Sequence, residues 1–350
     1  MAAPLRLCLL RLSALGDATH VLPLIDALQR ARPDAEITWI LGVSEAKLVA
    51  GLAGVELLVY DKRDGWSGAR KLAKTLAGRR FDALLQLQLA LRANLLSLSV
   101  PAARRIGFDS ARAKELHSLV IRERIAASAG PHVLDAFLGF LAPLGLGRPA
   151  ELHWPLVIPE QAHAFAREHL SERTRHLLIS PCASHPLRNW LPERYAAAAD
   201  FAWREHGLRP VLVGGRSVLE RAMADQIVEL CAAPVLDLVG KDTLKQLLAL
   251  LARADVVLSP DSGPIHFAQA LNTPTVGLYA CTDAQRSGPY RFRQLCTQRY
   301  AQAAELFLQR TPERLAWGQK IEKPGVMALI SVPEVCALIS TAAAMRPEKA

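Results

Sequence analysis

Short apolar runs alternate with segments of helical periodicity along the whole chain, and this alternation constrains the fold more than any other feature. Apolar runs such as residues 5–12 and 36–41 have the length of buried strands, and helix-length segments such as residues 21–32 lie between them. This order is typical of a parallel sheet covered by crossover helices. We therefore expect an α/β fold throughout.

The alternation occurs twice, which predicts two doubly wound units in tandem. In the first half, strands are predicted at residues 5–12, 36–41, 57–60, 83–87 and 105–107, with helices at 21–32, 45–52, 69–78 and 132–144. In the second half, strands are predicted at residues 177–180, 210–213, 235–238, 256–259 and 275–278, with helices at 194–206, 219–231, 244–252, 265–271 and 333–345. A chain of 350 residues suits two domains. Turn residues between 145 and 159 suit a linker, so we expect domains at 1–158 and 159–332, followed by a final segment at 333–350.

The charge of the chain favours an anionic partner. The net charge is +9, of which residues 1–154 contribute +6, and residues 62–80 contain seven cations against one anion. Nucleic acid, an anionic membrane surface and an acidic substrate would each suit this charge. Aromatic residues make up only 6% of the chain and no basic-aromatic recognition motif occurs, which disfavours nucleic acid. For any one cation of this run, the simplest interpretation is a solvated helix face.

Cysteine usage and apolar run lengths indicate an intracellular protein without a membrane span. The six cysteines are widely spaced, with no CxxC pair and no histidine at metal-ligand spacing, which indicates free thiols and no metal site. Arg6 and Arg11 interrupt the apolar N-terminus, so we do not expect a signal peptide. Polar residues interrupt the longest apolar region, residues 83–103, so it is not expected to span a bilayer.

Two of the segments that could carry chemistry combine a strand end with a helix start. Ligands of doubly wound sheets bind beyond the carboxyl ends of the strands. Residues 13–20 contain Gly16 and Asp17, and Asp17 could be a general base or, with Thr19, a helix cap. Residues 259–266 read Ser-Pro-Asp-Ser-Gly-Pro-Ile-His, a helix start that could bind phosphate or could be an ordinary capped helix.

Two further segments follow strands of the second half. Residues 180–192 gather small hydroxylated residues, Arg188 and Trp190, although Trp190 could simply cover the core and Arg188 could be a surface charge. Residues 213–217 read Val-Gly-Gly-Arg-Ser, which by itself is more often a tight turn than a site. None of these segments matches GxGxxG, which disfavours a nicotinamide enzyme.

Together these segments resemble glycosyltransferase family 9, the heptosyltransferases that add heptose to the lipopolysaccharide inner core. The resemblance covers nearly the whole chain and is most specific in ADVVLSPDSGPIHFAQALNTPTVGLY. It implies the GT-B architecture, in which two Rossmann-like domains with parallel sheets face each other across a cleft. It also implies that the final helix packs back on the first domain.

The resemblance assigns roles residue by residue. It implies that Asp17 is the catalytic base and that Asp261 holds the donor sugar. The remaining implied contacts are Ser184, Arg188, Gly263, Pro264 and His266 for the donor diphosphate, Gly214, Glu220, Gly240 and Lys241 for the nucleoside, and Arg112 and His132 for the acceptor. Lys62 and Arg63, from the basic run, are added as acceptor contacts. Arg188 stands where the family usually has lysine, and it can replace that point charge with a bidentate fork.

The resemblance implies an inverting, metal-independent transfer of heptose from ADP-heptose to the Kdo/heptose inner core of a lipid-linked acceptor. We expect no cofactor, no nucleic acid partner, and a cytoplasmic protein in peripheral contact with the anionic inner face of the inner membrane. Three alternatives remain. They are a same-family transferase with another nucleotide sugar or an outer-core acceptor, a basic nucleic-acid-binding α/β protein, and an inactive sugar-nucleotide-binding protein.

Overall fold

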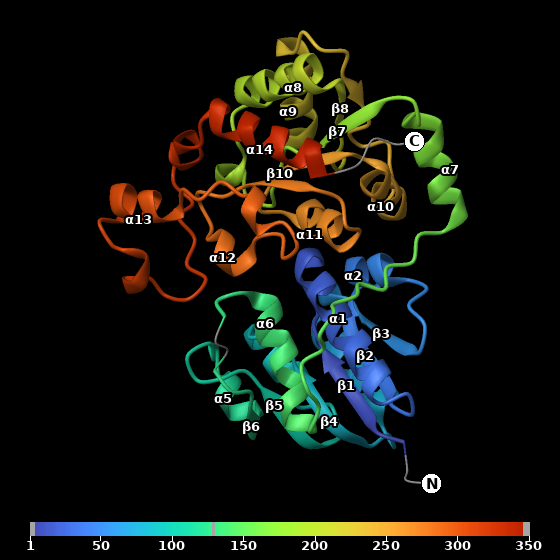
Figure 1. Ribbon diagram of the computed structural model, residues 1–350. Coiled ribbons are helices and arrows are strands. Elements are labelled where there is room, and N and C mark those ends of the chain that lie inside the picture. Colours follow the sequence, from blue (N-terminus) through green and yellow to red (C-terminus); the bar gives the residue numbers. More distant parts are fainter. Residues whose placement is uncertain (1–3, 128–129, 346–350) are drawn as a thin grey trace. The chain divides into compact units, whose positions relative to one another are not determined.

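The computed structural model describes residues 4–127 and 130–345, and it divides into two compact units between Val157 and Ile158. Each unit contains a parallel sheet with helices on it (Figure 1). The expected α/β fold is confirmed. The predicted domain boundary lies one residue away from this division.

The sheet of the first unit has the order β3-β2-β1-β4-β5-β6. Its strands are β1 (Arg6–Leu10), β2 (Glu36–Gly42), β3 (Val55–Tyr60), β4 (Phe81–Gln86), β5 (Ala102–Gly107) and β6 (Glu123–Arg124). Strand β1 lies at the centre, and its residues Leu7 to Leu10 have no exposed surface. Burial on both faces is what a continuous apolar run predicts for a parallel strand.

Helices cover this sheet and bury their apolar faces. They are α1 (Leu15–Ala31), α2 (Val43–Val49), α3 (Gly65–Leu76), α4 (Leu91–Ser97), α5 (His117–Val120) and α6 (Val133–Leu138), with 3-10 turns η1 (Lys62–Asp64) and η2 (Gly139–Leu144). Leu72 of α3 and Leu96 of α4 share one core cluster with Cys8 and Leu10 of β1, so α3 and α4 cover the same face of the sheet. Helix α1 packs with α6 and η2.

The sheet of the second unit has the order β11-β10-β7-β8-β9. Its strands are β7 (Arg175–Ile179), β8 (Leu208–Leu212), β9 (Leu236–Asp237), β10 (Val256–Pro260) and β11 (Thr275–Leu278). Its helices are α7 (Glu160–His169), α8 (Pro192–His206), α9 (Val218–Leu230), α10 (Leu244–Arg253), α11 (Gly263–Ala270), α12 (Ala284–Ser287), α13 (Tyr300–Leu308) and α14 (Val332–Met345), with 3-10 turns η3 (Pro186–Arg188), η4 (Arg293–Leu295), η5 (Pro312–Arg314) and η6 (Val326–Leu329).

The final helix α14 packs within the second unit. It contacts α8, β10 and β11, and Ile339 belongs to the core of that unit. The contact with the first domain that sequence analysis expects stays a prediction. Sequence analysis predicts no helix at α4, α5, α7, α12 or α13, and these are additions to the predicted pattern.

Two predicted helices differ in their extent. The helix predicted at residues 132–144 is α6 followed by η2, because Pro143 lies in that stretch and lacks the N–H that an α-helix needs. Helix α1 begins at Leu15, six residues before the predicted start, and it contains Pro23. All six cysteines are free, as expected.

Candidate active site

In the second unit the predicted donor residues follow the carboxyl ends of the strands. Residues 180–191 follow β7, residues 213–217 follow β8, and Gly240 follows β9. Asp261 directly follows β10, and Ser262 separates it from the first residue of α11. In a parallel sheet these ends share one edge, which is where a doubly wound unit binds its ligand.

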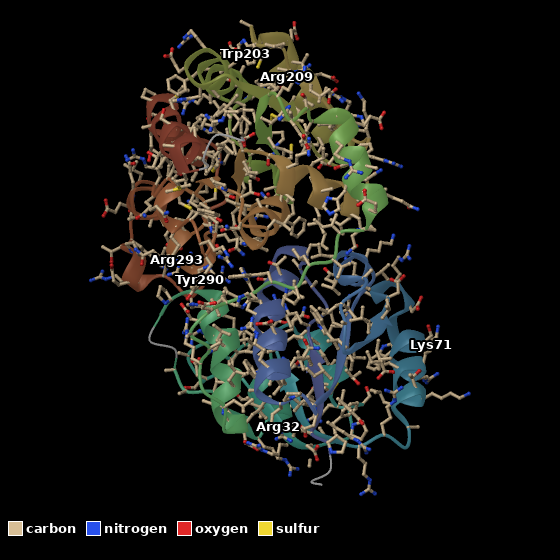
Figure 2. The ribbon with its side chains drawn as sticks, turned by 45° about the vertical axis from the view of Figure 1, so that its right-hand side comes forward. Arg32, Lys71, Trp203, Arg209, Tyr290 and Arg293 are labelled. Carbon is tan, nitrogen blue, oxygen red and sulfur yellow. The ribbon has the colours of Figure 1, made fainter. Side chains whose placement is uncertain are left out.

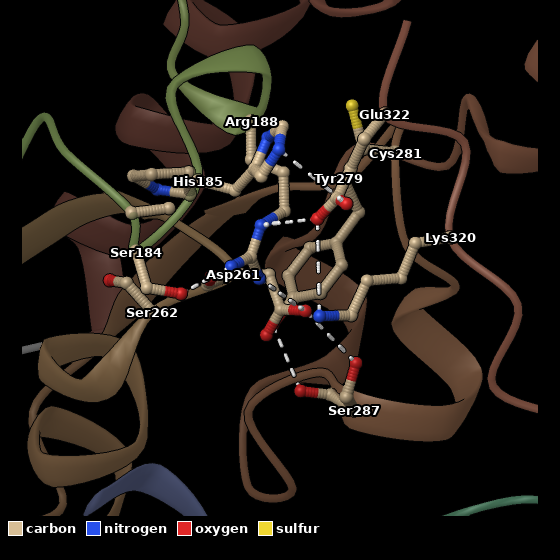
Figure 3. Close-up of polar contacts among 12 residues, drawn as sticks. Ser184, His185, Arg188, Asp261, Ser262, Tyr279, Cys281, Ser287, Lys320 and Glu322 are labelled. Atoms are coloured by element: carbon tan, nitrogen blue, oxygen red, sulfur yellow. Dashed lines mark hydrogen bonds and ion pairs between the residues drawn. The ribbon is translucent and has the colours of Figure 1, made fainter. Parts of the chain in front are cut away.

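Arg188 is the centre of a buried polar cluster at this edge (Figure 3). Its Nη1 donates to the backbone oxygen of Asp261 at 3.3 Å, and its Nη2 donates to Oγ of Ser184. The same Nη1 lies 3.9 Å from Oδ2 of Asp261. Only 7% of Arg188 is exposed, so its interpretation as a solvated surface charge is wrong. Trp190 does cover the core, and its Nε1 donates to the backbone oxygen of Ile330.

Glu322 joins this cluster from a segment that sequence analysis left without a role. Its Oε1 lies 3.2 Å from Nε of Arg188 and 3.9 Å from Nζ of Lys320 (Figure 3). Its Oε2 lies 3.9 Å from Nε2 of His185. The carboxylate therefore sits among two permanent cations and a histidine. The two cations, Arg188 and Lys320, would suit a diphosphate.

The Asp261 carboxylate is buried but stays ionised. Burial raises its pKa, while His266, Thr282 and Arg188 lower it, and the net pKa lies below the ordinary value. Nε2 of His266 lies 3.6 Å from Oδ1, and Oγ of Ser287 donates to Oδ2 at 3.4 Å. An ionised acceptor beside a cluster of cations suits the hydroxyl groups of a sugar.

The start of α11 carries no side-chain cap from Ser262. Ser262 occupies the N-cap position, but its hydroxyl contacts Oγ of Ser259 at 2.8 Å and makes no capping hydrogen bond. The interpretation of this segment as an ordinary capped helix is therefore wrong. Gly263 and Pro264 begin the helix, and a Cβ at Gly263 would lie 3.1 Å from the Phe267 ring. The N-terminus of a helix without a side-chain cap carries a partial positive charge, which favours binding of an anion.

The predicted nucleoside residues form a second group at the ends of β8 and β9. Glu220 forms a capping box with Ser217 at the start of α9, and its Oε1 also accepts from the backbone N–H of Gly215 at 2.7 Å. Gly240 has φ +76°, which favours glycine, and its N–H donates to the backbone oxygen of Gly214 at 2.9 Å. Nζ of Lys241 donates to the backbone oxygen of Asp237. The hydrogen bond between Gly240 and Gly214 joins the two loops that carry Gly214, Gly240 and Lys241, and Glu220 lies at the start of α9 beside the first loop.

Asp17 does not cap α1. The N-cap is Ala14, with no side-chain cap, and the hydroxyl of Thr19 donates to the backbone oxygen of Gly16. The capping alternative is therefore wrong for both residues. Oδ2 of Asp17 instead pairs with Nη2 of Arg11, whose Nη1 donates to the backbone oxygen of Leu87. Sequence analysis missed Arg11, although it lies directly after the central strand.

Two of the predicted acceptor residues of the first unit, Arg112 and His132, are buried. Arg112 is buried and pairs with Asp109, and His132 is buried with Nδ1 accepting from the backbone N–H of Leu134. The first contact is a buried ion pair and the second caps α6. Their contact with the acceptor stays a prediction.

Lys62 and Arg63 line a cavity of about 720 Å³ at the carboxyl edge of the first sheet. Arg63 forms a two-pronged ion pair with Asp61, at 2.6 and 3.0 Å. The other polar and charged residues of the lining are Ser13, Ser44, Glu45, Lys47, Tyr60, Gln88, Arg92 and Glu115. Four cations in this lining against three acids suit an acidic ligand.

Within residues 4–127 and 130–345, no three or more His, Cys, Asp and Glu side chains are grouped in a way that could hold a metal ion. Over the same residues, no helix combines the length and the apolar character that crossing a bilayer requires.

The sequence model of glycosyltransferase family 9 (heptosyltransferase) matches residues 69–344. The chain belongs to glycosyltransferase family 9. It is 37% identical over 333 residues to the lipopolysaccharide core heptosyltransferase OpsX of Haemophilus influenzae, with 95% of each chain covered. Family membership favours the enzyme over the nucleic-acid-binding alternative.

Solved structures share the fold of this family 9 protein. A family 9 glycosyltransferase from Veillonella parvula has a TM-score of 0.81 at 21% identity, with 99% of each chain covered. The E. coli heptosyltransferase WaaC with ADP-2-deoxy-2-fluoro heptose has a TM-score of 0.66 at 22% identity, covering 80% of this chain and 90% of that one. The expected GT-B type of fold, with two parallel α/β sheets, is confirmed.

Proposed function

We propose that this family 9 transferase moves heptose from ADP-heptose to the Kdo/heptose inner core of lipopolysaccharide, with inversion at the anomeric carbon. The Haemophilus influenzae relative is a lipopolysaccharide core heptosyltransferase, which supports the sugar and the acceptor class. The E. coli WaaC structure holds a fluorinated ADP-heptose, which is the same class of donor. The single observation that carries the proposal is the buried Arg188–Asp261 cluster beside the start of α11.

The donor is proposed to lie along the carboxyl edge of the second sheet. Arg188, Ser184 and the first turn of α11 at Gly263, Pro264 and His266 hold the diphosphate. Asp261 accepts hydrogen bonds from the sugar. The nucleoside is held by Gly214 and Glu220 after β8 and by Gly240 and Lys241 after β9. The Glu220 carboxylate already accepts from the backbone of Gly215, so a ribose hydroxyl would share it.

Asp17 is the proposed general base. Its Oδ2 is held by Arg11, which orients the carboxylate and leaves Oδ1 to accept the proton. The acceptor oxygen loses its proton to Asp17 and forms the new bond to the anomeric carbon. The bond from that carbon to the diphosphate oxygen breaks, and ADP departs with the electron pair. Arg188 and the α11 start stabilise the charge on the departing diphosphate.

The acceptor is proposed to bind at the cavity lined by Lys62 and Arg63, where the lining is cationic. Arg112 and His132 are kept as weaker acceptor candidates, since both are buried. The acceptor is lipid-linked, so we propose that the protein works at the cytoplasmic face of the inner membrane without crossing it.

The test is transfer from competing nucleotide sugars. Purified protein receives an equimolar mixture of ADP-heptose, ADP-glucose and UDP-glucose with an inner-core acceptor, and the products are separated by mass. We expect a mass increase of one heptose, and NMR of the product should give the anomeric configuration opposite to that of the donor. Transfer of a hexose instead would favour the same-family alternative with another donor. Binding of ADP without any transfer would favour the inactive sugar-nucleotide-binding protein.

A further inference from the structure

Helix α4 and its C-cap expose three leucines to solvent. Leu91, Leu95 and Leu98 recur at a spacing of four and three residues, and they are 41%, 45% and 61% exposed. The opposite side of the same helix buries Ala93 and Leu96 in the core of the first unit. The helix is therefore apolar on both sides, and folding of this unit buries only one of them.

Helix α5 extends this apolar surface. Leu116 and Leu119 are 59% and 76% exposed. The two helices are tied together, because the Glu115 carboxylate accepts from the backbone N–H of Leu91 and Nδ2 of Asn94 donates to the backbone oxygen of Glu115. We call Leu91, Leu95, Leu98, Leu116 and Leu119 the leucine face. Contiguous exposed apolar surface of this kind marks an interaction site.

The charges around the leucine face favour an anionic surface as its partner. Arg92, Lys114 and Arg122 are exposed on the same segments. The acid among them, Glu115, already accepts from the Leu91 N–H. Apolar side chains surrounded by cations are typical of a surface that lies in the interface of an anionic lipid leaflet.

The leucine face is continuous with the proposed acceptor cavity. Leu91 belongs to both, since it lines the cavity of about 720 Å³ that also contains Lys62, and its exposed neighbour Arg92 lines the same cavity. An acceptor that is anchored in a bilayer must be met at the lipid surface. A leucine face at the rim of the cavity would keep the opening of the cavity at that lipid surface.

We propose that the leucine face inserts into the headgroup–acyl boundary of an anionic membrane leaflet and presents the acceptor cavity to lipid-linked acceptor. This inference rests on the proposed function for the identity of the acceptor, but the docking itself does not require transfer. The surface is distinct from the basic run at residues 62–80, which supplies charge. The leucine face supplies apolar area.

The test is flotation with vesicles of phosphatidylethanolamine and phosphatidylglycerol. The variant carries Leu95→Gln, Leu98→Gln and Leu119→Gln, none of which lines the cavity. The matched control carries Val228→Gln, Leu230→Gln and Leu306→Gln, which are exposed apolar residues of the second unit. We expect partition of the variant to fall on the order of a hundredfold, because three leucines lose their burial in lipid, and partition of the control to stay unchanged.

Further readouts separate docking from folding and from catalysis. The melting temperature and ADP affinity of the variant should match those of the wild type. If the melting temperature of the triple variant is lowered, Leu119→Gln alone is used, and it should give a smaller loss of partition. The variant should still use an acyl-free acceptor in solution and should lose transfer to acceptor in vesicles. The wild type could transfer nothing to the acyl-free acceptor while the leucine substitutions still reduce partition into vesicles. That result would support docking and overturn only the proposed function.

Partition of the variant equal to that of the wild type would overturn the proposal. If a wild-type dimer in sedimentation also became monomeric in the variant, the leucine face would contact a second copy of the chain instead of lipid.

Discussion

At the scale of single residues, the site depends on carboxylates that are held by arginines. Asp17 is held by Arg11, and Glu322 lies against Arg188. In each pair the arginine also binds a backbone oxygen, of Leu87 in the first and of Asp261 in the second. A guanidinium can fix a carboxylate and the main chain together from separate nitrogens in a rigid fork, whereas a lysine offers all its donors from one nitrogen.

Replacing Asp17 with asparagine separates its proposed chemical role from its structural role. Asn keeps the size of the side chain but cannot take a proton, so turnover should fall by about 10²- to 10⁴-fold. Because Asp17 does not cap α1 and its pair with Arg11 is partly exposed, stability should fall by no more than about 1 kcal/mol. ADP affinity should stay unchanged.

The matched control for this variant is Asp34→Asn, which breaks the exposed pair with Arg32 and should leave turnover unchanged. Turnover and urea unfolding are measured on both variants. An Asp17→Asn enzyme with most of its activity would exclude Asp17 as the base and make the adjacent His20 the next residue to test.

We expect Glu322 to hold Arg188 in position and, because it is negatively charged, to weaken binding of the diphosphate. Glu322→Gln removes a negative charge beside the proposed diphosphate site, so ADP should bind about 3- to 10-fold more tightly. Arg188 then loses an anionic partner, and single-turnover transfer should slow by roughly tenfold. Calorimetric titration with ADP and rapid-quench transfer measure the two effects.

Glu313→Gln, an exposed substitution nearby in the chain, is the control and should change neither value. A role in folding alone would lower ADP affinity and the melting temperature together. Weaker ADP binding by Glu322→Gln would therefore contradict the assignment of Glu322 as a positioning residue.

At the scale of elements, helix α3 presents cations outward while it buries Leu72 and Leu76. Figure 2 shows Lys71 projecting from this helix away from the sheet. Arg79 does not belong with these cations, because its guanidinium binds the Glu56 carboxylate at 2.5 and 2.9 Å. The exposed cations that remain for a membrane are Lys71, Lys74, Arg70 and Arg80.

Neutralising these four cations with glutamine should weaken binding to anionic vesicles. Each cation near a lipid surface contributes about 1 kcal/mol, so partition at low salt should fall by about 10²- to 10³-fold. The wild-type affinity should also fall with added salt, since the attraction is screened. Flotation at several salt concentrations measures both effects.

Arg173→Gln with Arg310→Gln serves as the control, since both are exposed cations of the second unit. If the fourfold variant floats as well as the wild type, α3 is only a solvated helix face and the leucine face alone accounts for docking.

At the scale of the whole molecule, the order of elements could be predicted because both sheets are parallel. The strands that are buried on both faces, such as β1 and β10, are nearly continuous apolar runs. Helix α4 escaped prediction because its leucines face both the core and the solvent, so no single apolar stripe identifies a helix.

The candidate site could be predicted where it lies at the junction of a strand and the next helix, as for Asp17 in the first turn of α1 and Asp261 after β10. Glu322 could not be predicted, because it comes to Arg188 from 134 positions along the chain and from a segment without a regular pattern. The burial of His132 and Arg112 also escaped, since it depends on packing against α1 and on the pair with Asp109.

Transfer should proceed without divalent metal, because Arg188 and the α11 start supply positive charge where the diphosphate is proposed to leave. ADP release is measured in excess EDTA and again after magnesium or manganese is restored. We expect equal rates within about twofold. A loss in EDTA that either metal reverses would contradict the metal-free mechanism.

The six free thiols can report the local stability of each of the two units. Cys8 lies in the fully buried central strand of the first unit, and the other five cysteines lie in the second. A thiol reagent modifies a buried cysteine only when the surrounding structure opens. The rate at which Cys8 is modified therefore measures opening of the first unit, and Cys281 and Cys296 measure opening of the second. Peptide mass mapping of one labelling time course would give the local stability of each unit in the intact chain.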